Sequence, residues 1–335
     1  MNQEGKNKDL IKMYSNYSPF PGRYKKFFSE ESFIKRKYFT FLIKKKLLNK
    51  DNIRRKNKLY FRKYLPDCSS NIRIIDIGCG TGECAVNLAL AYPNAEVIGV
   101  DASLASLNLA NKLKNFLNIK NLELIEQNIQ TEFKNFGKFD LILCAGVLHH
   151  LDQPKEVLKN ISKLMIRNKT ILSLQIYCDY GRNQENHIQQ GIRELFPDDK
   201  KLKQRINFIK IMDLDHNIVI GSPYGTKNTI NKTITRTIRA IKTLFFCEYV
   251  MPDKDTILYD ALVCPVAKFY KAEDIDKLIQ YTDLKLVDFD FNSESSKKLK
   301  NKIDGYLKNK EKLTALKIKA KFIYPSDCIL ILKSL

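Results

Sequence analysis

The chain has 335 residues, of which 44% are apolar, and a formal net charge of +21. This length leaves room for a hydrophobic core and for substantial additions to it. No apolar stretch approaches the roughly 18 residues that cross a bilayer, and the polar N-terminus lacks a signal peptide's apolar stretch, so we expect a cytoplasmic protein without a transmembrane segment. The eight cysteines are scattered, and we interpret them as reduced thiols.

The positive charge is unevenly distributed. Lys and Arg are in excess in residues 1–70 and 181–335, whereas residues 71–180 carry equal numbers of acidic and basic side chains. Basic clusters beside aromatic residues can contact RNA, anionic lipid or an acidic substrate. Because the whole chain is rich in Lys, Asn and Ile, a solvated helix face is the favoured interpretation, and nucleic acid is not a favoured partner.

The N-terminal segment combines aromatic rings with turn-forming residues. Tyr14 and Tyr17 are followed by a run with two prolines and a glycine, which favours an ordered aromatic loop. Residues 33–42 then place apolar side chains at roughly helical spacing. We therefore predict an N-terminal arm made of a loop and a helix.

A strand and a glycine-rich loop follow. Residues 72–77 are rich in isoleucine, and such β-branched residues suit a strand buried on both faces of a parallel sheet. Gly78, Gly80 and Gly82 end this strand and leave no Cβ between the backbone and a ligand. A helix over residues 83–92 would direct its free N–H groups toward the same space. The pattern predicts a ligand-binding loop.

The spacing of the glycines restricts the ligand. Glu83 stands where a dinucleotide fingerprint needs its last glycine, and the Gly-Lys-Ser/Thr of a phosphate loop is absent. The stretch from Asp76 to Gly82 resembles the first motif of class I S-adenosylmethionine-dependent methyltransferases. The resemblance implies S-adenosyl-L-methionine as the cofactor, with the acid orienting the loop and contacts at Asp76, Gly78, Cys79, Gly80 and Gly82.

A second acid follows the next predicted strand. Residues 96–101 form a short apolar run that ends in Asp101. A carboxylate at the tip of the second strand can accept both hydroxyls of a ribose, although an acid alone also suits a helix start. Together with the glycine loop, the ribose interpretation is preferred, with Ala102 beside it as a further cofactor contact.

The third predicted strand covers residues 122–129. The resembling family usually has an Asp after it, which holds the adenine amino group, whereas this chain has Asn128 followed by Ile129. An amide oxygen can still accept that hydrogen bond, but Asn128 equally suits a turn. We carry both residues forward as cofactor contacts.

The fourth predicted strand, residues 139–144, leads into a histidine pair. This region resembles small-molecule and lipid methyltransferases, in which such a pair faces the methionine end of the cofactor, and it implies Cys144 as a cofactor contact. A neutral imidazole of His149 or His150 could take a proton from a substrate hydroxyl or amine. The alternative is that the pair only ends a turn and packs, because alignment alone suffices for many such enzymes. No metal site is expected.

The remaining segments complete the expected sheet and add a cap. We predict a helix over 154–164, a fifth strand over 170–176, a helix over 272–281 and closing strands over 284–289 and 322–332, the last one antiparallel and inserted beside the sixth. The chain has Arg-Asn-Lys-Thr at 167–170 where the family usually has a Pro-Gly-Gly turn. Residues 177–270, with a helix over 187–195, are too long for a simple connection.

Aromatic residues at two places resemble a bacterial methyltransferase subgroup that is often fused to tetratricopeptide repeats, although no such repeats are visible here. The resemblance rests on the Tyr-rich stretch 14–24 and on Tyr177 with Arg182. It implies a lid whose rings cover the sulfonium cation; the alternative is an arm that only packs on the core. The candidate substrate residues are Tyr14, Tyr17, Tyr177 and Arg182.

The predicted fold is a doubly wound α/β sheet of seven strands, mostly parallel with an antiparallel last strand, plus an N-terminal helical arm and an inserted cap. The expected function is methyl transfer to the oxygen, nitrogen or carbon of a small-molecule or lipid-like acceptor. An RNA methyltransferase, a protein methyltransferase and a non-catalytic cofactor-binding protein are the alternatives, and the oligomeric state stays open. The predicted divisions are an arm (1–70), a cofactor-binding core (71–176), a cap (177–270) and a closing segment (271–335).

Overall fold

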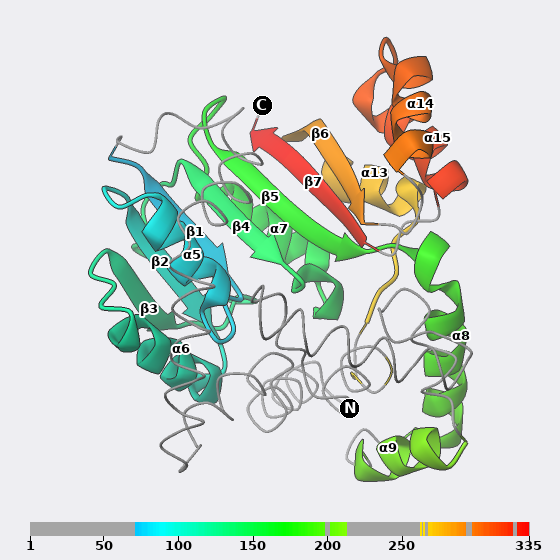
Figure 1. Cartoon of the computed structure of the whole chain (residues 1–335), viewed down its shortest axis with the longest axis horizontal. Helices are drawn as coiled ribbons and strands as arrows, with labels where there is room; N and C mark the ends of the chain where they lie inside the picture. Colours follow the sequence, from blue (N-terminus) through cyan, green and yellow to red (C-terminus); the bar gives the residue numbers. More distant parts are fainter. Residues whose placement is uncertain are drawn as a thin grey trace.

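The computed structural model of the chain describes residues 71–197, 202–212, 262, 264, 267–292, 297–323 and 327–334. These residues form one seven-stranded sheet with the order β3-β2-β1-β4-β5-β7-β6 (Figure 1). The strands are β1 (Arg73–Ile77), β2 (Glu96–Asp101), β3 (Leu122–Glu126), β4 (Leu141–Ala145), β5 (Ile171–Tyr177), β6 (Leu284–Asn292) and β7 (Asp327–Ser334). The predicted N-terminal arm and most of the predicted cap lie outside the described residues.

Helices follow β1, β2, β4 and β5, whereas β3 leads into β4 without a helix, and further helices extend past the sheet. They are α5 (Glu83–Ala91), α6 (Leu104–Phe116), the short η1 (Leu148–His150), α7 (Pro154–Ser162), α8 (Asp179–Leu195), α9 (Leu202–Ile211), α13 (Ala272–Gln280), α14 (Lys297–Leu307) and α15 (Lys312–Ile323). Figure 1 shows α14 and α15 at the β6 end of the sheet and α8 leading away from the end of β5.

The direction of the strands confirms the predicted fold class. Strands β1 to β5 pair in parallel, and β7 pairs antiparallel with both β5 and β6. The chain turns back between β1 and β4, because β2 and β3 lie on one side of β1 and β5 lies on the far side of β4. In sheets of this kind, ligands bind at the carboxyl ends of the strands at such a reversal.

The core lies on both faces of the sheet, as expected for continuous apolar strands. Neighbouring residues of one strand point to opposite faces. Ile75 therefore packs with the helices α7 and α13, while Ile74 packs with α5 and α6. Ile142 and Leu141 of β4 divide between the same two clusters.

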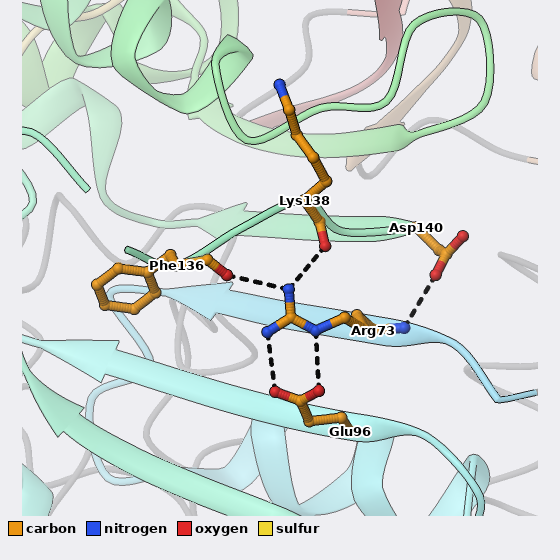
Figure 2. A network of polar contacts seen from close by, with 5 residues as sticks. All are labelled: Arg73, Glu96, Phe136, Lys138 and Asp140. Carbon is orange, nitrogen blue, oxygen red and sulfur yellow. Dashed lines mark hydrogen bonds and ion pairs between the residues drawn. The ribbon is translucent and has the colours of Figure 1, made fainter. Parts of the chain in front are cut away.

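A polar network fastens the amino ends of the strands (Figure 2). The Arg73 guanidinium donates two hydrogen bonds to Glu96, at 2.8 and 2.9 Å, and its Nη1 donates to the carbonyls of Phe136 and Lys138. The backbone N–H of Arg73 donates to Asp140 at 2.9 Å. Because Arg73 begins β1, this network lies at the opposite end of the strand from the glycine loop.

The C-terminal elements correct one predicted boundary. We expected the last strand to begin at Phe322, but the chain is helical up to Ile323 and β7 begins at Asp327. The reason is visible in α15, where Leu316 and Ala320 are four residues apart and both are buried against the core, a helical rather than a strand period. The strand β7 lies between β5 and β6, as the inserted antiparallel strand was expected to lie.

Two further segments differ in detail from expectation. The helix after β5 begins at Asp179 rather than near His187. The turn before β5 has Asn168 with a φ of 57°, a conformation that Asn tolerates better than most residues. An asparagine therefore provides the left-handed position for which the family uses glycine.

Candidate functional site

The loop after β1 is fastened to the end of β2. The N–H groups of Gly78 and Cys79 both donate to the carbonyl of Val100, at 2.8 and 2.9 Å. Gly78, Gly80 and Gly82 have φ values of 72°, 53° and 78°. These positive values are strained for residues with a Cβ, so the sequence needs glycine at each position to make this turn.

The three glycines have different surroundings. A Cβ on Gly78 would lie 2.3 Å from a methyl group of Val147, and a Cβ on Gly82 would lie 2.7 Å from that of Ala110. A Cβ on Gly80 would meet no atom of the described residues within 4 Å. Gly78 and Gly82 therefore allow close packing, whereas Gly80 borders open space at the carboxyl ends of the strands.

Asp76 is a buried acid next to this loop. Its side chain receives a hydrogen bond from the backbone N–H of Ala85, and its Oδ2 has no hydrogen-bond partner in the described part of the chain. Burial, followed by the negative charge of Asp101, raises the pKa of Asp76 to about 7. A buried polar atom without a partner requires an explanation, and a positively charged ligand at the loop would provide one.

Asp101 ties the end of β2 to the glycine loop. Its Oδ2 accepts the N–H of Gly80 and its Oδ1 accepts the N–H of Ser103, each at 2.8 Å. Burial raises the pKa of Asp101, while the backbone hydrogen bonds from Ser103, Gly80 and Ala102 oppose that effect. Each oxygen keeps a lone pair for another donor, so Asp101 can still accept ribose hydroxyls. Ala102 is half-buried beside it.

Asn128 occupies the turn that follows β3. Its Oδ1 accepts the N–H of Gln130 at 3.0 Å, and its carbonyl accepts the N–H of Thr131. Asn128 therefore stabilises a turn, as one of its two predicted roles requires. The second lone pair of Oδ1 could still accept a hydrogen bond from the adenine amino group. Ile129 is buried in the core cluster next to it.

Cys144, a predicted cofactor contact, is buried, whereas Gly146, which the sequence analysis missed, borders open space. The Cys144 side chain is fully buried in the α7/α13 cluster, and burial, with a smaller contribution from Asp76, raises the pKa of its thiol to about 12. Two residues further, Gly146 has a φ of 75°, and a Cβ there would meet no atom within 4 Å in the part of the chain that the structure describes. Gly146 therefore borders open space after β4 as Gly80 does after β1. Its position directly after an apolar strand was the signal that could have identified it.

The two histidines of η1 have different environments. His149 is fully buried, and its ring stacks on Tyr177 with centroids 3.6 Å apart. Neither ring nitrogen of His149 has a hydrogen-bond partner among the described residues, whereas Nδ1 of His150 lies 3.2 Å from the sulfur of Cys264. Burial, then His150 and Arg182, hold the pKa of His149 well below its ordinary value. His149 is thus a neutral imidazole with a donor and an acceptor that the described residues do not use.

Two of the four predicted substrate residues, Tyr177 and Arg182, lie in the described part of the chain and form a stack with His149. The guanidinium carbon of Arg182 lies 3.9 Å from the centroid of the Tyr177 ring. Its Nη1 pairs with Glu185 at 2.7 Å and its Nη2 with Asp327 at 3.1 Å. Tyr177 is only 7% exposed because Arg182 covers one face of its ring and His149 the other. The remaining substrate candidates, Tyr14 and Tyr17, lie outside the described residues.

These residues fit S-adenosylmethionine. Gly80 leaves room for a ligand beside the backbone, Asp76 offers an unused carboxylate oxygen for a cation, and Asp101 offers lone pairs for a ribose. Within the described ranges, no group of three His, Cys, Asp or Glu side chains is placed to hold a metal ion. In the same ranges, no helix is both long and apolar enough to cross a membrane.

The sheet topology and this loop define a class of α/β proteins that bind a nucleoside cofactor at the reversal of strand order. Comparison with known proteins supplies the family. Residues 68–236, slightly more than half of the chain, match the family described as a methyltransferase domain. The chain belongs to this methyltransferase domain family, in its class I, S-adenosylmethionine-dependent form.

Several proteins are similar to parts of the chain. A Rickettsia prowazekii protein, RP028, is 34% identical over 120 residues, which is 35% of this chain and 48% of that protein. The malonyl-[acyl-carrier protein] O-methyltransferase of Legionella pneumophila is 31% identical over 100 residues, 30% of this chain and 34% of that enzyme. The chain spans less than half the length of the curated relatives it matches.

Solved structures with the same fold include one of a protein lysine methyltransferase named PKMT2. This structure, from Rickettsia typhi and in complex with AdoHcy, has a TM-score of 0.52 and 22% identity over 79% of this chain and 49% of that chain. The predicted fold, methyltransferase class and S-adenosylmethionine cofactor are confirmed. The individual site residues stay predictions, as does the resemblance to the subgroup fused to tetratricopeptide repeats.

Proposed function

We propose that this protein transfers the methyl group of S-adenosylmethionine to a hydroxyl or amine of a small-molecule or lipid-like acceptor. The observation that carries the proposal is the pairing of open space at Gly80 with the unused oxygen of Asp76. When bound, the cofactor supplies an electrophilic methyl group on a sulfonium. Asp76 and the glycine loop would hold its amino-acid part, and Asp101 its ribose.

The acceptor would bind near the carboxyl ends of β4 and β5. Gly146 borders open space there, and His149 follows it by one turn. The neutral imidazole of His149 would accept the proton that a hydroxyl or amine loses as its bond to the methyl group forms. Because His149 is fully buried, only a small group could reach its ring. The similarity to an enzyme named as an O-methyltransferase also supports an acceptor oxygen.

The test is a transfer assay that does not require a known acceptor. The full chain is incubated with S-adenosylmethionine labelled in its methyl group and a bacterial extract, which is then separated into lipid, small-molecule, protein and RNA fractions. We expect the label in the lipid or small-molecule fraction. Label that accumulates only in protein or RNA would contradict the proposed acceptor class.

Two variants make the test specific for the glycine loop. Gly80→Arg fills the open space beside the loop and should abolish both transfer and cofactor binding, measured by calorimetry. Gly305→Arg is the matched control, because it makes the same substitution in α14, where a Cβ also meets nothing within 4 Å. Equal cofactor binding by both variants would refute the placement of the cofactor, whatever the acceptor is.

A further inference from the structure

We propose that Arg182 is a positioning residue that holds the His149 imidazole in place and keeps it uncharged, rather than a residue that contacts the substrate. The inference rests on the methyl-transfer function proposed above. It assigns a role to the contact between Arg182 and Tyr177, which the transfer chemistry does not itself require. It is carried by the order of the stack, in which Arg182 covers Tyr177 and Tyr177 covers His149.

The guanidinium is fixed from two elements. Glu185 lies one turn along α8 and pairs with Nη1, while Asp327 at the start of β7 pairs with Nη2. Burial opposes the charge of Arg182, but Tyr177, Glu185 and Asp327 together raise its pKa above the ordinary value. Arg182 is therefore charged at every relevant pH, and its hydrogen-bonding groups are directed at this chain's own carboxylates.

The fixed guanidinium in turn restricts the orientation of His149 through the Tyr177 ring. The Tyr177 ring lies between the two groups, 3.9 Å from the guanidinium carbon and 3.6 Å from the imidazole centroid. The planes of Tyr177 and His149 differ by 26°. A ring clamped on one face by a cation has little freedom to tilt, so the imidazole that packs on its other face keeps one orientation.

The backbone of His149 is fixed as well. Its carbonyl accepts the N–H of Lys268 at 2.8 Å, and the Lys268 ammonium donates to the carbonyl of Asp152 at 2.7 Å. The turn that carries His149 is therefore tied to the segment before α13. The imidazole nitrogens are the polar atoms of this residue that the described residues leave without a partner.

Burial of the ring, and then the neighbouring charges, favour the neutral form of His149. His150 adjoins it on η1, Tyr177 faces it from β5, and Arg182 with Glu185 approaches from α8. On β7, Asp327 pairs with Arg182. In the segment before α13, the ammonium of Lys268 donates to the backbone carbonyl of Asp152. Among the described residues, the two carboxylates nearest this stack, Glu185 and Asp327, pair with Arg182 rather than with His149.

Histidine titration measured by NMR tests this directly and needs no acceptor. The full chain has four histidines, so labelled histidine gives few signals, and His149→Gln and His150→Gln assign the pair. In the unmodified protein the His149 signal should stay that of a neutral ring down to well below pH 6.5. In Arg182→Met the His149 signal should titrate at a measurably higher pH, because one nearby positive charge has gone while the burial of the ring, the larger cause, remains.

Two controls separate this role from general damage. Arg182→Lys keeps the charge and should leave His149 neutral. If Arg182→Met does not fold, Arg182→Met with Asp327→Asn removes both members of this ion pair; His149 should still titrate at a higher pH than in the unmodified protein. An ordinary titration of His149 in the unmodified protein, or identical titrations with Lys and Met at 182, would overturn the proposal. Cofactor binding measured on the same samples reports separately on the proposed function.

Discussion

The buried acid beside the glycine loop should make stability depend on pH in a way that a single substitution removes. Asp76 is 3% exposed, its Oδ2 has no hydrogen-bond partner among the described residues, and its pKa is raised to about 7, mainly by burial. Asp76→Asn keeps the shape of the side chain but cannot ionise. The variant therefore isolates the free-energy cost of placing a carboxylate at this position.

The magnitude follows from the difference in pKa between the folded chain, about 7, and the unfolded chain, 3.8. Between these values the folded state retains a proton that the unfolded state has lost, so the free energy of unfolding falls as pH rises and levels off above pH 7. From pH 5 to pH 8 the fall covers two pH units, or about 3 kcal/mol. An unpaired amide in Asp76→Asn costs roughly 1–3 kcal/mol, but this cost is the same at both pH values.

Urea unfolding of the cofactor-free protein at pH 5 and pH 8 measures this effect. Relative to the unmodified protein, Asp76→Asn should be more stable at pH 8 than at pH 5 by about 3 kcal/mol. Asp283→Asn, on an exposed turn, is the matched control and should show no such difference. If the two proteins lose stability in parallel between the two pH values, Asp76 is not a strained buried acid and the reasoning fails.

The same variant should lose affinity for the cofactor. The ammonium group of S-adenosylmethionine is a partner that a carboxylate binds more strongly than an amide does, and a charged hydrogen bond contributes about 1.5–3 kcal/mol. Calorimetry at pH 8 should therefore show binding weakened by roughly 10- to 100-fold. A substitution that removes the free-energy cost of an ionised buried acid while it weakens cofactor binding is the pattern expected of a residue retained for function.

Three further substitutions test other parts of the molecule. Gly146→Leu should abolish cofactor binding, measured by calorimetry, and undiminished binding would remove Gly146 from the site. The substitution should also cost about 1–2 kcal/mol in urea unfolding, since φ is 75° at this position. His149→Gln should lower transfer by about 10²- to 10⁴-fold with unchanged cofactor affinity, measured in single turnovers; an unchanged rate would leave alignment as the only contribution. Arg73→Met should cost about 1–2 kcal/mol in unfolding experiments and leave cofactor affinity unchanged, because its network lies at the opposite end of β1.

Much of the fold follows from local sequence, because the strands are buried on both faces and are therefore continuous apolar runs. The runs that became β1, β2 and β4 each end in a polar or glycine-rich turn, which fixes their direction. The error at Phe322 has the opposite cause. Phe322 and Ile323 are apolar enough for a strand, but they end the helix α15, one face of which, including Leu316, is buried against α13 and β6. Tertiary packing of this kind is not encoded in a short window.

The sequence indicates where a candidate site residue lies in the fold when one element supplies both its geometry and its chemistry. The loop glycines and Asp101 fall in this class, since the strand before each fixes its position. Arg182 and Asp327 do not, because their contact joins residues 145 positions apart. The difference between the two histidines likewise depends on Cys264, which is 114 positions from His150. Spacing along the sequence finds such residues but does not reveal what they contact.

The charge around His149 also bears on the acceptor. A protonated amine cannot attack the methyl group until it loses a proton, and binding it beside a sulfonium places two cations together. Such an acceptor would be favoured by a nearby carboxylate, but the two that the described residues place beside this stack, Glu185 and Asp327, both pair with Arg182. A hydroxyl or an uncharged amine carries no such penalty and releases its proton only as the new bond forms, which is when a neutral imidazole can accept it. The arrangement of His149, Tyr177 and Arg182 therefore favours an uncharged acceptor over an ammonium group.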